Sequence, residues 1–177
     1  SCREVEQVIG KDIYGSGVDE LESIVGELLK QTGLSLAIAE SCSGGLLSHR
    51  ITRIPGSSLY FVGGAVTYSN EMKTSFLGVE PDRIKHYGAV SHEVASAMAA
   101  GIMKRCKTDL GISITGIAGP DGGTEEKPVG TVFIALASSE GVHVKGYQFN
   151  GDRAKVQRMS AFMALEWLRR FALRRQE

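Results

Sequence analysis

The sequence lacks any apolar run close to the roughly 20 residues that a helix needs to cross a bilayer. Its start, Ser1-Cys2-Arg3-Glu4, lacks the apolar stretch of a signal peptide. Charge of one sign is also missing, because 20 basic residues balance 20 acidic ones among 177. That balance argues against broad electrostatic attraction to nucleic acids or membranes. We therefore expect no membrane and no nucleic acid among the partners.

Cysteine and histidine are scarce. The three cysteines, Cys2, Cys42 and Cys106, have no C-x-x-C spacing, which excludes the usual patterns of a disulfide framework or a structural zinc site. The four histidines show no metal-ligand spacing such as H-E-x-x-H. The sequence thus predicts no metal and no cofactor, and a reducing, cytoplasmic location.

Residues 1–17 are polar and end in Tyr14-Gly15-Ser16-Gly17. We interpret them as a leader or linker. Beyond residue 18 we find no internal repeat and no domain boundary, so residues 18–177 are expected to form one domain with its own core.

Apolar runs alternate with segments of helical periodicity. Strands are expected at 35–39, 59–68, 110–115, 131–137 and 142–149, the last two as a hairpin around Ser139-Glu140-Gly141. Helices are expected at 19–33, from the turn at Ser41 to about 54, at 69–78, 91–105 and 152–174. The pattern predicts an α/β fold, a three-layer α/β/α sandwich with a mixed, mostly parallel sheet.

Residues 36–45, Leu-Ala-Ile-Ala-Glu-Ser-Cys-Ser-Gly-Gly, have the pattern of a buried strand, a tight turn and a helix start. Such turns lie at the carboxyl edge of a sheet, where open α/β folds bind ligands. A nucleophile at Ser41 would have the first backbone N–H groups of the helix beside it to stabilise an oxyanion. The alternative is that Ser41 only caps the helix.

Cys42 is the competing nucleophile, because a thiolate is favoured near a helix start. No histidine can be placed beside it from the sequence, however. The alternative is a small buried residue that packs behind the turn.

Three further candidates follow other strands: Tyr68, Lys73 and Thr115. A lysine can serve as the base for a serine if burial lowers its pKa, and a tyrosine can orient or relay the proton. Thr115 opens a glycine-rich loop whose N–H groups could bind an anion. Arg153 could bind phosphate or carboxylate. A solvated Lys73, a solvated Arg153 and a flexible loop are the alternatives.

Five ordered segments resemble one family. They are Ala39-Glu40-Ser41-Cys42-Ser43-Gly44-Gly45, Val66-Thr67-Tyr68-Ser69-Asn70-Glu71-Met72-Lys73, Gly88-Ala89-Val90-Ser91, Thr115-Gly116-Ile117-Ala118-Gly119-Pro120-Asp121-Gly122-Gly123 and Lys127-Pro128-Val129-Gly130-Thr131. Over about residues 18–170 the chain is similar to the C-terminal domain of the competence/damage-inducible protein CinA, the nicotinamide-nucleotide amidohydrolase family. Members occur alone or behind a molybdopterin-binding-like domain, and the leader resembles the join between the two.

The resemblance implies a hydrolase that deamidates nicotinamide mononucleotide to nicotinic acid mononucleotide and ammonia. It implies a catalytic set of Ser41 as nucleophile with Lys73, Tyr68 and Thr115. Substrate-binding roles then fall to the signature turn, the glycine-rich loop and the arginine before the last helix, that is to Ser43, Gly44, Gly45, Gly116, Gly119 and Arg153. The small-molecule partner would be a pyridine nucleotide, and we expect a homo-oligomer.

Two other functions stay open from the sequence. The domain could be a catalytically silent nucleotide-binding module of a larger CinA-like protein. It could also be a thiol hydrolase that uses Cys42.

Overall fold

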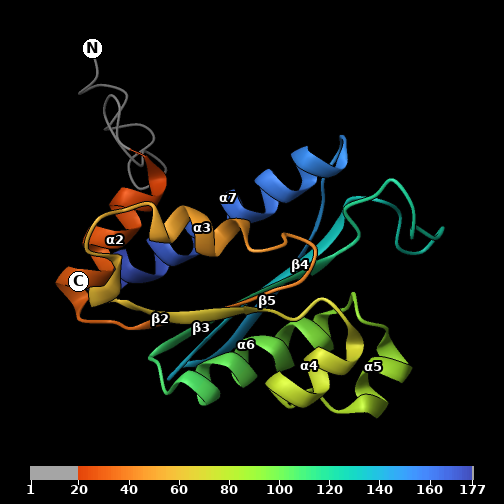
Figure 1. The fold of residues 1–177 in the computed structure, drawn as a ribbon, viewed down its shortest axis with the longest axis horizontal. Coiled ribbons are helices and arrows are strands. Elements are labelled where there is room, and N and C mark those ends of the chain that lie inside the picture. The colour runs from red at the N-terminus through yellow and green to blue at the C-terminus, as the bar shows by residue number, and fades with distance from the viewer. Residues whose placement is uncertain (1–19, 177) are drawn as a thin grey trace.

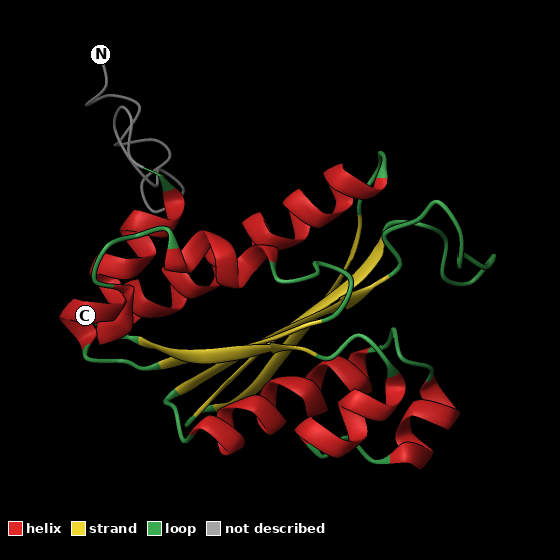
Figure 2. Ribbon diagram, viewed as in Figure 1, coloured by secondary structure: helices red, strands yellow, loops and turns green. Residues whose placement is uncertain are grey.

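The computed structural model describes residues 20–176, and its elements form three layers (Figures 1 and 2). One face of the sheet is covered by α2 (Leu21–Thr32), α3 (Leu46–Thr52) and α7 (Arg153–Arg174). The other face is covered by α4 (Asn70–Leu77), α5 (Pro81–Tyr87) and α6 (His92–Cys106). The predicted α/β/α sandwich is confirmed. The predicted leader or linker at 1–17 lies outside the described residues.

The middle layer is one five-stranded sheet. In chain order its strands are β1 (Leu36–Glu40), β2 (Phe61–Val66), β3 (Leu110–Gly116), β4 (Thr131–Ser138) and β5 (Gly141–Gln148). They lie in the order β2-β1-β3-β4-β5. β2, β1 and β3 are parallel, whereas β4 and β5 are the predicted antiparallel hairpin. The sheet is therefore mixed, as the sequence predicts.

Strands β1 and β3 are buried on both faces, which explains why they read as nearly continuous apolar runs. Ile38 and Ile112 point into the core under α2, α3 and α7. Ala37 and Ala39 pack on the opposite face, against the core that includes Met98 of α6. Both helix layers thus hold the carboxyl ends of β1 and β3 in place.

The expectation of a buried strand at 59–68 is wrong in part. A 3₁₀ turn occupies Ser57–Leu59, and β2 lies at an edge of the sheet. Its side chains alternate, and Val62 and Val66 are 60% and 45% exposed. An apolar run does not distinguish a central strand from an edge strand, because only the sheet order decides which faces are covered.

Helix ends follow the predicted capping residues. Gly33 ends α2 and Gly78 ends α4, both in the left-handed conformation. The side chains of Ser91 and Asp152 accept hydrogen bonds from the backbone N–H groups of Val94 and Lys155 at the starts of α6 and α7.

No helix between residues 20 and 176 combines the length and the apolar character that a bilayer crossing requires.

Gly111 in β3 lies directly beneath α6. A Cβ at this position would collide with the carbonyl oxygen of Ala99 and come within 2.6 Å of Met103 Cβ. We therefore expect Gly111→Ala to lower the free energy of unfolding in urea by about 2 kcal/mol or more, because the helix must move away from the sheet. Gly63→Ala in β2 is the matched control, since its Cβ would meet nothing within 4 Å. We expect that control to be neutral or to stabilise by about 0.5 kcal/mol. An equal loss of stability in both variants would contradict the close packing of α6 on Gly111.

Candidate active site

The carboxyl ends of the three parallel strands meet at one edge of the sheet. Glu40, the last residue of β1, is in register with Val66 of β2 and Ile114 of β3. Ser41 follows at once, and its backbone N–H donates to the Ile114 carbonyl at 2.9 Å. The segments after β1, β2 and β3 are therefore neighbours, as the predicted parallel order requires.

Lys73 reaches this edge from α4. The side chain of Ser69 caps α4 by accepting the Met72 N–H at 3.1 Å, and Lys73 lies in the first turn and a half. Its Nζ lies 3.2 Å from Ser41 Oγ. Both residues are buried, with Ser41 8% and Lys73 1% exposed. Two residues that are 32 positions apart in the sequence thus form a hydrogen-bonded pair.

The remaining partners of Lys73 are neutral. Its Nζ donates to the carbonyl oxygens of Thr67 at 2.9 Å and Tyr68 at 3.1 Å. Within residues 20–176 no carboxylate forms an ion pair with it. Burial lowers the pKa of Lys73 below its ordinary value of 10.5, and the nearby Cys42 opposes that shift. A buried amine without a counter-ion is disposed to lose its proton.

This geometry accommodates both forms of the amine. A neutral lysine has two N–H donors and one lone pair, whereas the ammonium has three donors. The ammonium donates to Ser41 Oγ and to the Thr67 and Tyr68 carbonyls. The neutral amine keeps its two donors on the carbonyls and offers its lone pair to the Ser41 hydroxyl. The arrangement can therefore accept the hydroxyl proton of Ser41, which is the role of a general base.

The turn after Ser41 differs from the predicted helix start. Helix α3 begins only at Leu46, and its N-cap is Gly45, so Ser41 does not cap it. Gly44 and Gly45 adopt positive φ values of 65° and 98°, which favour glycine. The backbone N–H of Gly44 donates to the Ser41 carbonyl at 3.1 Å and closes the turn.

Glu40 occupies the N-terminus of α3. Its fully buried carboxylate accepts the backbone N–H groups of Gly45 and Leu47, both at 3.1 Å, and of Ser48 at 2.8 Å. It also accepts the Ser48 hydroxyl at 2.7 Å. The expectation that the first N–H groups of this helix would stabilise an oxyanion is therefore wrong, because Glu40 already satisfies them.

Two other N–H groups of the turn remain available. In the described part of the chain, the backbone N–H groups of Cys42 and Ser43 donate to no other residue. Ser43 Oγ, on a side chain that is 3% exposed, is likewise buried without a hydrogen-bond partner there. A buried hydroxyl of this kind is costly unless a ligand or water satisfies it. All three groups belong to the two residues that directly follow Ser41.

Cys42 is buried, and its surroundings favour the neutral thiol. Its side chain is 4% exposed, and burial raises the pKa of its thiol from 9.0 to about 12. Its backbone carbonyl accepts a hydrogen bond from Gln157 of α7 at 2.9 Å. The thiolate that a thiol hydrolase needs is thus strongly disfavoured at neutral pH. Packing behind the turn is the role that this environment supports.

Tyr68 and Arg153 meet, but not in the predicted way. Arg153 donates to Tyr68 Oη and to the Gly119 carbonyl, both at 2.9 Å. It is the backbone carbonyl of Tyr68, not its phenol, that holds Lys73. Arg153 is the first residue of α7 and lies on the exposed side of the site. It therefore joins the segment after β2 to the glycine-rich loop.

Thr115 is fully buried, and its hydroxyl donates to the Ala89 carbonyl at 2.9 Å. That bond fastens the end of β3 to the segment before α6. The next residue, Gly116, leaves no room for a side chain, because a Cβ would come within 2.7 Å of the Thr131 carbonyl oxygen and 3.0 Å of Cys42 Sγ. Through these contacts Thr115 and Gly116 pack behind the turn at residues 41–45 and help to hold it in position.

The glycine-rich loop projects beyond the sheet (Figure 1). Gly119 has a φ of 83°, and its carbonyl accepts from Arg153. Farther along, Lys127 Nζ donates to the Tyr87 carbonyl at 2.8 Å and anchors the loop to the end of α5. Of the predicted binding residues in this loop, Gly119 is thus the one joined to Arg153.

Sequence reasoning missed three residues that shape the site: Glu40, Thr67 and Gln157. An acidic residue inside a buried apolar strand, followed by a helix start, was a signal for Glu40. The hydroxyl of Thr67 is buried without a partner among the described residues. Nothing in the sequence relates Gln157 or the Thr67 carbonyl to Ser41, because their contacts arise between distant elements.

Fold and site together define a three-layer α/β/α domain with a buried serine–lysine pair at its sheet edge. A family model described as the CinA C-terminal domain matches residues 18–172. The chain belongs to this CinA C-terminal domain family.

Curated relatives support the assignment. A CinA-like protein of Desulfotalea psychrophila is 49% identical over 173 residues, which cover 98% of this chain and 42% of that protein. A CinA-like protein of Geotalea uraniireducens is 50% identical over 158 residues, which cover 89% of this chain and 38% of that protein. The chain thus spans about two fifths of the length of the curated relatives that it matches.

Solved structures share the fold. A CinA superfamily protein from Klebsiella pneumoniae has a TM-score of 0.85 at 30% identity, with 90% of this chain and 99% of that one covered. The competence/damage inducible protein CihA from Agrobacterium tumefaciens has a TM-score of 0.80 at 34% identity, with 87% and 97% covered.

Glu40→Gln tests the carboxylate in the turn. An amide offers one acceptor oxygen in place of two, so at least one buried N–H group of the α3 start loses its partner. We expect the free energy of unfolding in urea to fall by about 2–4 kcal/mol. The matched control is Glu80→Gln, at the N-cap of α5, whose carboxylate is exposed and lies 3.9 Å from Arg83. Its effect should stay below about 1 kcal/mol, and similar losses in both variants would contradict the role of Glu40.

Proposed function

We propose that this domain hydrolyses the carboxamide of nicotinamide mononucleotide to nicotinic acid mononucleotide and ammonia. The observation that carries the proposal is the buried Lys73 amine, 3.2 Å from Ser41 Oγ with two carbonyls as its other partners. The amide and nucleotide specificity rests on the five motif segments that resemble the amidohydrolase family. The pair supplies a base and a nucleophile for acyl transfer without a metal ion.

In the first half-reaction, neutral Lys73 takes the hydroxyl proton of Ser41 as Oγ attacks the carboxamide carbon. The oxygen of the carboxamide becomes an oxyanion. The backbone N–H groups of Cys42 and Ser43 stabilise it, since Glu40 already binds those at the start of α3. The Ser43 hydroxyl is a third donor at the same turn.

The tetrahedral intermediate then collapses. The C–N bond breaks, and Lys73 returns its proton to the leaving nitrogen, which departs as ammonia. An acyl ester on Ser41 remains. Lys73, neutral again, removes a proton from water as the water attacks the ester, and then returns it to Ser41 Oγ as the carboxylate product leaves.

The nucleotide part binds on the exposed side. Arg153 has a planar guanidinium suited to phosphate, and its present partners are neutral oxygens of Tyr68 and Gly119. A phosphate would be a stronger partner than either. Tyr68 would then orient the phosphate or the ribose, while Thr115 and Gly116 support the turn. A homo-oligomer and a cytoplasmic location stay predictions.

Ser41→Ala is the direct test, with ammonia release from nicotinamide mononucleotide measured in the presence of a chelator. We expect a loss of at least about 10³-fold in kcat, as for other serine nucleophiles. Cys42→Ala is the control from the neighbouring position and should keep most of the activity. Full activity in Ser41→Ala would refute the nucleophile, and a dead Cys42→Ala that remains folded would favour the thiol. A wild-type domain that binds the nucleotide without releasing ammonia would establish the silent module instead.

The pH profile tests Lys73 as the base. Only the neutral amine can accept a proton, so kcat/KM should rise tenfold per pH unit below the pKa of Lys73 and level off above it. Because burial lowers that pKa, the plateau should begin below pH 10.5. Lys73→Arg keeps the positive charge but cannot lose it, and we expect it to be folded and inactive at every pH. An unchanged rising limb in that variant would assign the limb to another group.

A further inference from the structure

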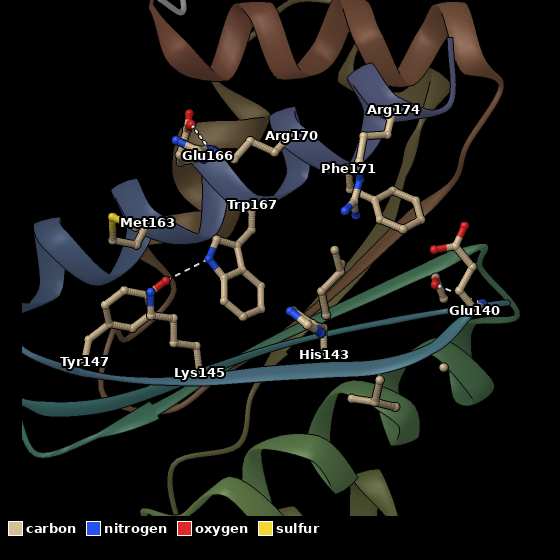
Figure 3. Close-up of a pocket in the computed structure, with 14 residues that line it drawn as sticks. Glu140, His143, Lys145, Tyr147, Met163, Glu166, Trp167, Arg170, Phe171 and Arg174 are labelled. Atoms are coloured by element: carbon tan, nitrogen blue, oxygen red, sulfur yellow. Dashed lines mark hydrogen bonds and ion pairs between the residues drawn. The ribbon is translucent and has the colours of Figure 1, made fainter. Parts of the chain in front are cut away.

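A hollow lies away from Ser41, between α7 and β5. It has a volume of about 560 Å³, within the ~300–1,000 Å³ typical of small-molecule sites. Figure 3 shows α7 on one side and β5 on the other, with side chains from both pointing into the space. None of the residues that form the Ser41 site lines this groove, which we call the α7–β5 groove.

The spacing of the lining residues explains the groove. One face of α7 contributes every fourth residue, namely Met163, Trp167 and Phe171. One face of β5 contributes every second residue, namely His143, Lys145 and Tyr147. β5 is an edge strand, and α7 packs mainly on α2 and α3 rather than over β5. The sheet face beside β5 therefore remains uncovered in this layer.

Aromatic side chains form the middle of the groove. Trp167 Nε1 donates to Tyr147 Oη at 2.8 Å, which joins the helix to the strand. The His143 ring lies 5.8 Å from the Trp167 ring, between their centroids. Trp167 and Tyr147 are only partly buried. Phe149 stacks on the Tyr147 ring with the centroids 5.4 Å apart, so the exposed part of Trp167 is the main aromatic surface left for a ligand. Planar rings are good partners for such surfaces.

The carboxylates of the groove are already paired. Glu166 accepts from Arg169 and Arg170, and Glu140 forms an ion pair with Arg175 at 2.7 Å. Burial alone would raise the pKa of Glu166, but its hydrogen bonds from the two arginines outweigh burial and lower that pKa. These acids are thus neutralised by their own partners.

Two cations of the groove have no such partner. Within residues 20–176, neither Lys145 nor Arg174 forms an ion pair with a carboxylate. Lys145 Nζ lies 5.4 Å from the centre of the Tyr147 ring, and Arg174 Cζ lies 5.7 Å from that of Phe171. In Figure 3 the two lie on opposite sides of Trp167. An anion would complement either of them.

We propose that the α7–β5 groove binds a small planar aromatic anion, the chemical class to which mononucleotides belong. The ring of the ligand packs on Trp167, and its anionic group pairs with Lys145 or Arg174. The groove is a separate site from Ser41, so this binding does not depend on amide hydrolysis.

Trp167 is the only tryptophan in the chain, so its fluorescence reports on this groove alone. The experiment titrates adenosine monophosphate into the Ser41→Ala variant. We expect a saturable change in Trp167 emission. Adenosine, which has the ring without the charge, and ribose 5-phosphate, which has the charge without the ring, should each bind at least about tenfold more weakly.

The double variant Lys145→Gln/Arg174→Gln, in the same Ser41→Ala background, should weaken binding of adenosine monophosphate by at least about tenfold. Arg105→Gln is the matched control. Its guanidinium also stacks on a phenylalanine, with Cζ 4.1 Å from the centre of the Phe76 ring, but it lies outside the groove. That control should bind as tightly as its parent. Circular dichroism checks that each variant is folded.

Three outcomes would overturn the proposal. One is an emission that does not change up to millimolar ligand, and another is equal affinity in the double variant and its parent. The third is that the Trp167 emission changes with protein concentration and that sedimentation shows self-association of the parent, which the double variant has lost. That result would assign the groove to a second copy of the chain. Since Ser41→Ala is used throughout, failure of the proposed hydrolysis leaves these measurements unaffected.

Discussion

The carboxylate of Glu40 lies at the N-terminus of α3, where it accepts three backbone N–H groups and the Ser48 hydroxyl. A helix start attracts negative charge, and a fully buried carboxylate needs several donors to be tolerated there. The N–H groups at the start of α3 thus stabilise the carboxylate, and the carboxylate gives these N–H groups their hydrogen-bond acceptor. The bonds span the turn from the end of β1 to the start of α3, so the positions of Ser41, Cys42 and Ser43 depend on them.

One consequence concerns anion binding at the site. In many α/β folds a helix start at the sheet edge binds an anion of the ligand. Here Glu40 takes that place, and the N–H groups of Cys42 and Ser43, which directly follow Ser41, have no backbone partner among the described residues. Arg153 lies on the exposed side of the site, and its partners there are neutral oxygens. The turn is thereby suited to a small oxyanion.

Lys73 depends on the same edge of the sheet from the opposite helix layer. Its two carbonyl partners belong to the residues that follow β2, and the Thr67 N–H donates to the Glu40 carbonyl at 2.8 Å. Thr67 therefore links the strand that carries Ser41 to the lysine that faces it. The α7–β5 groove shares α7 with this edge, because Arg153 and Gln157 lie in the first turns of that helix, but none of the groove's lining residues belongs to the Ser41 site.

The sequence by itself determined the layers, the hairpin, the helix caps and the gathering of Ser41, Tyr68 and Thr115 at one edge. These follow from local periodicity, from capping chemistry and from the rule that parallel strands end together. Only the tertiary structure decided that β2 is an edge strand, that Glu40 fills the helix start and that Lys73 is buried against Ser41. Burial and hydrogen-bond partners arise between elements far apart in the chain, and no local pattern encodes them. For the same reason the hydroxyl of Thr115 and the phenol of Tyr68 have partners that sequence reasoning did not predict.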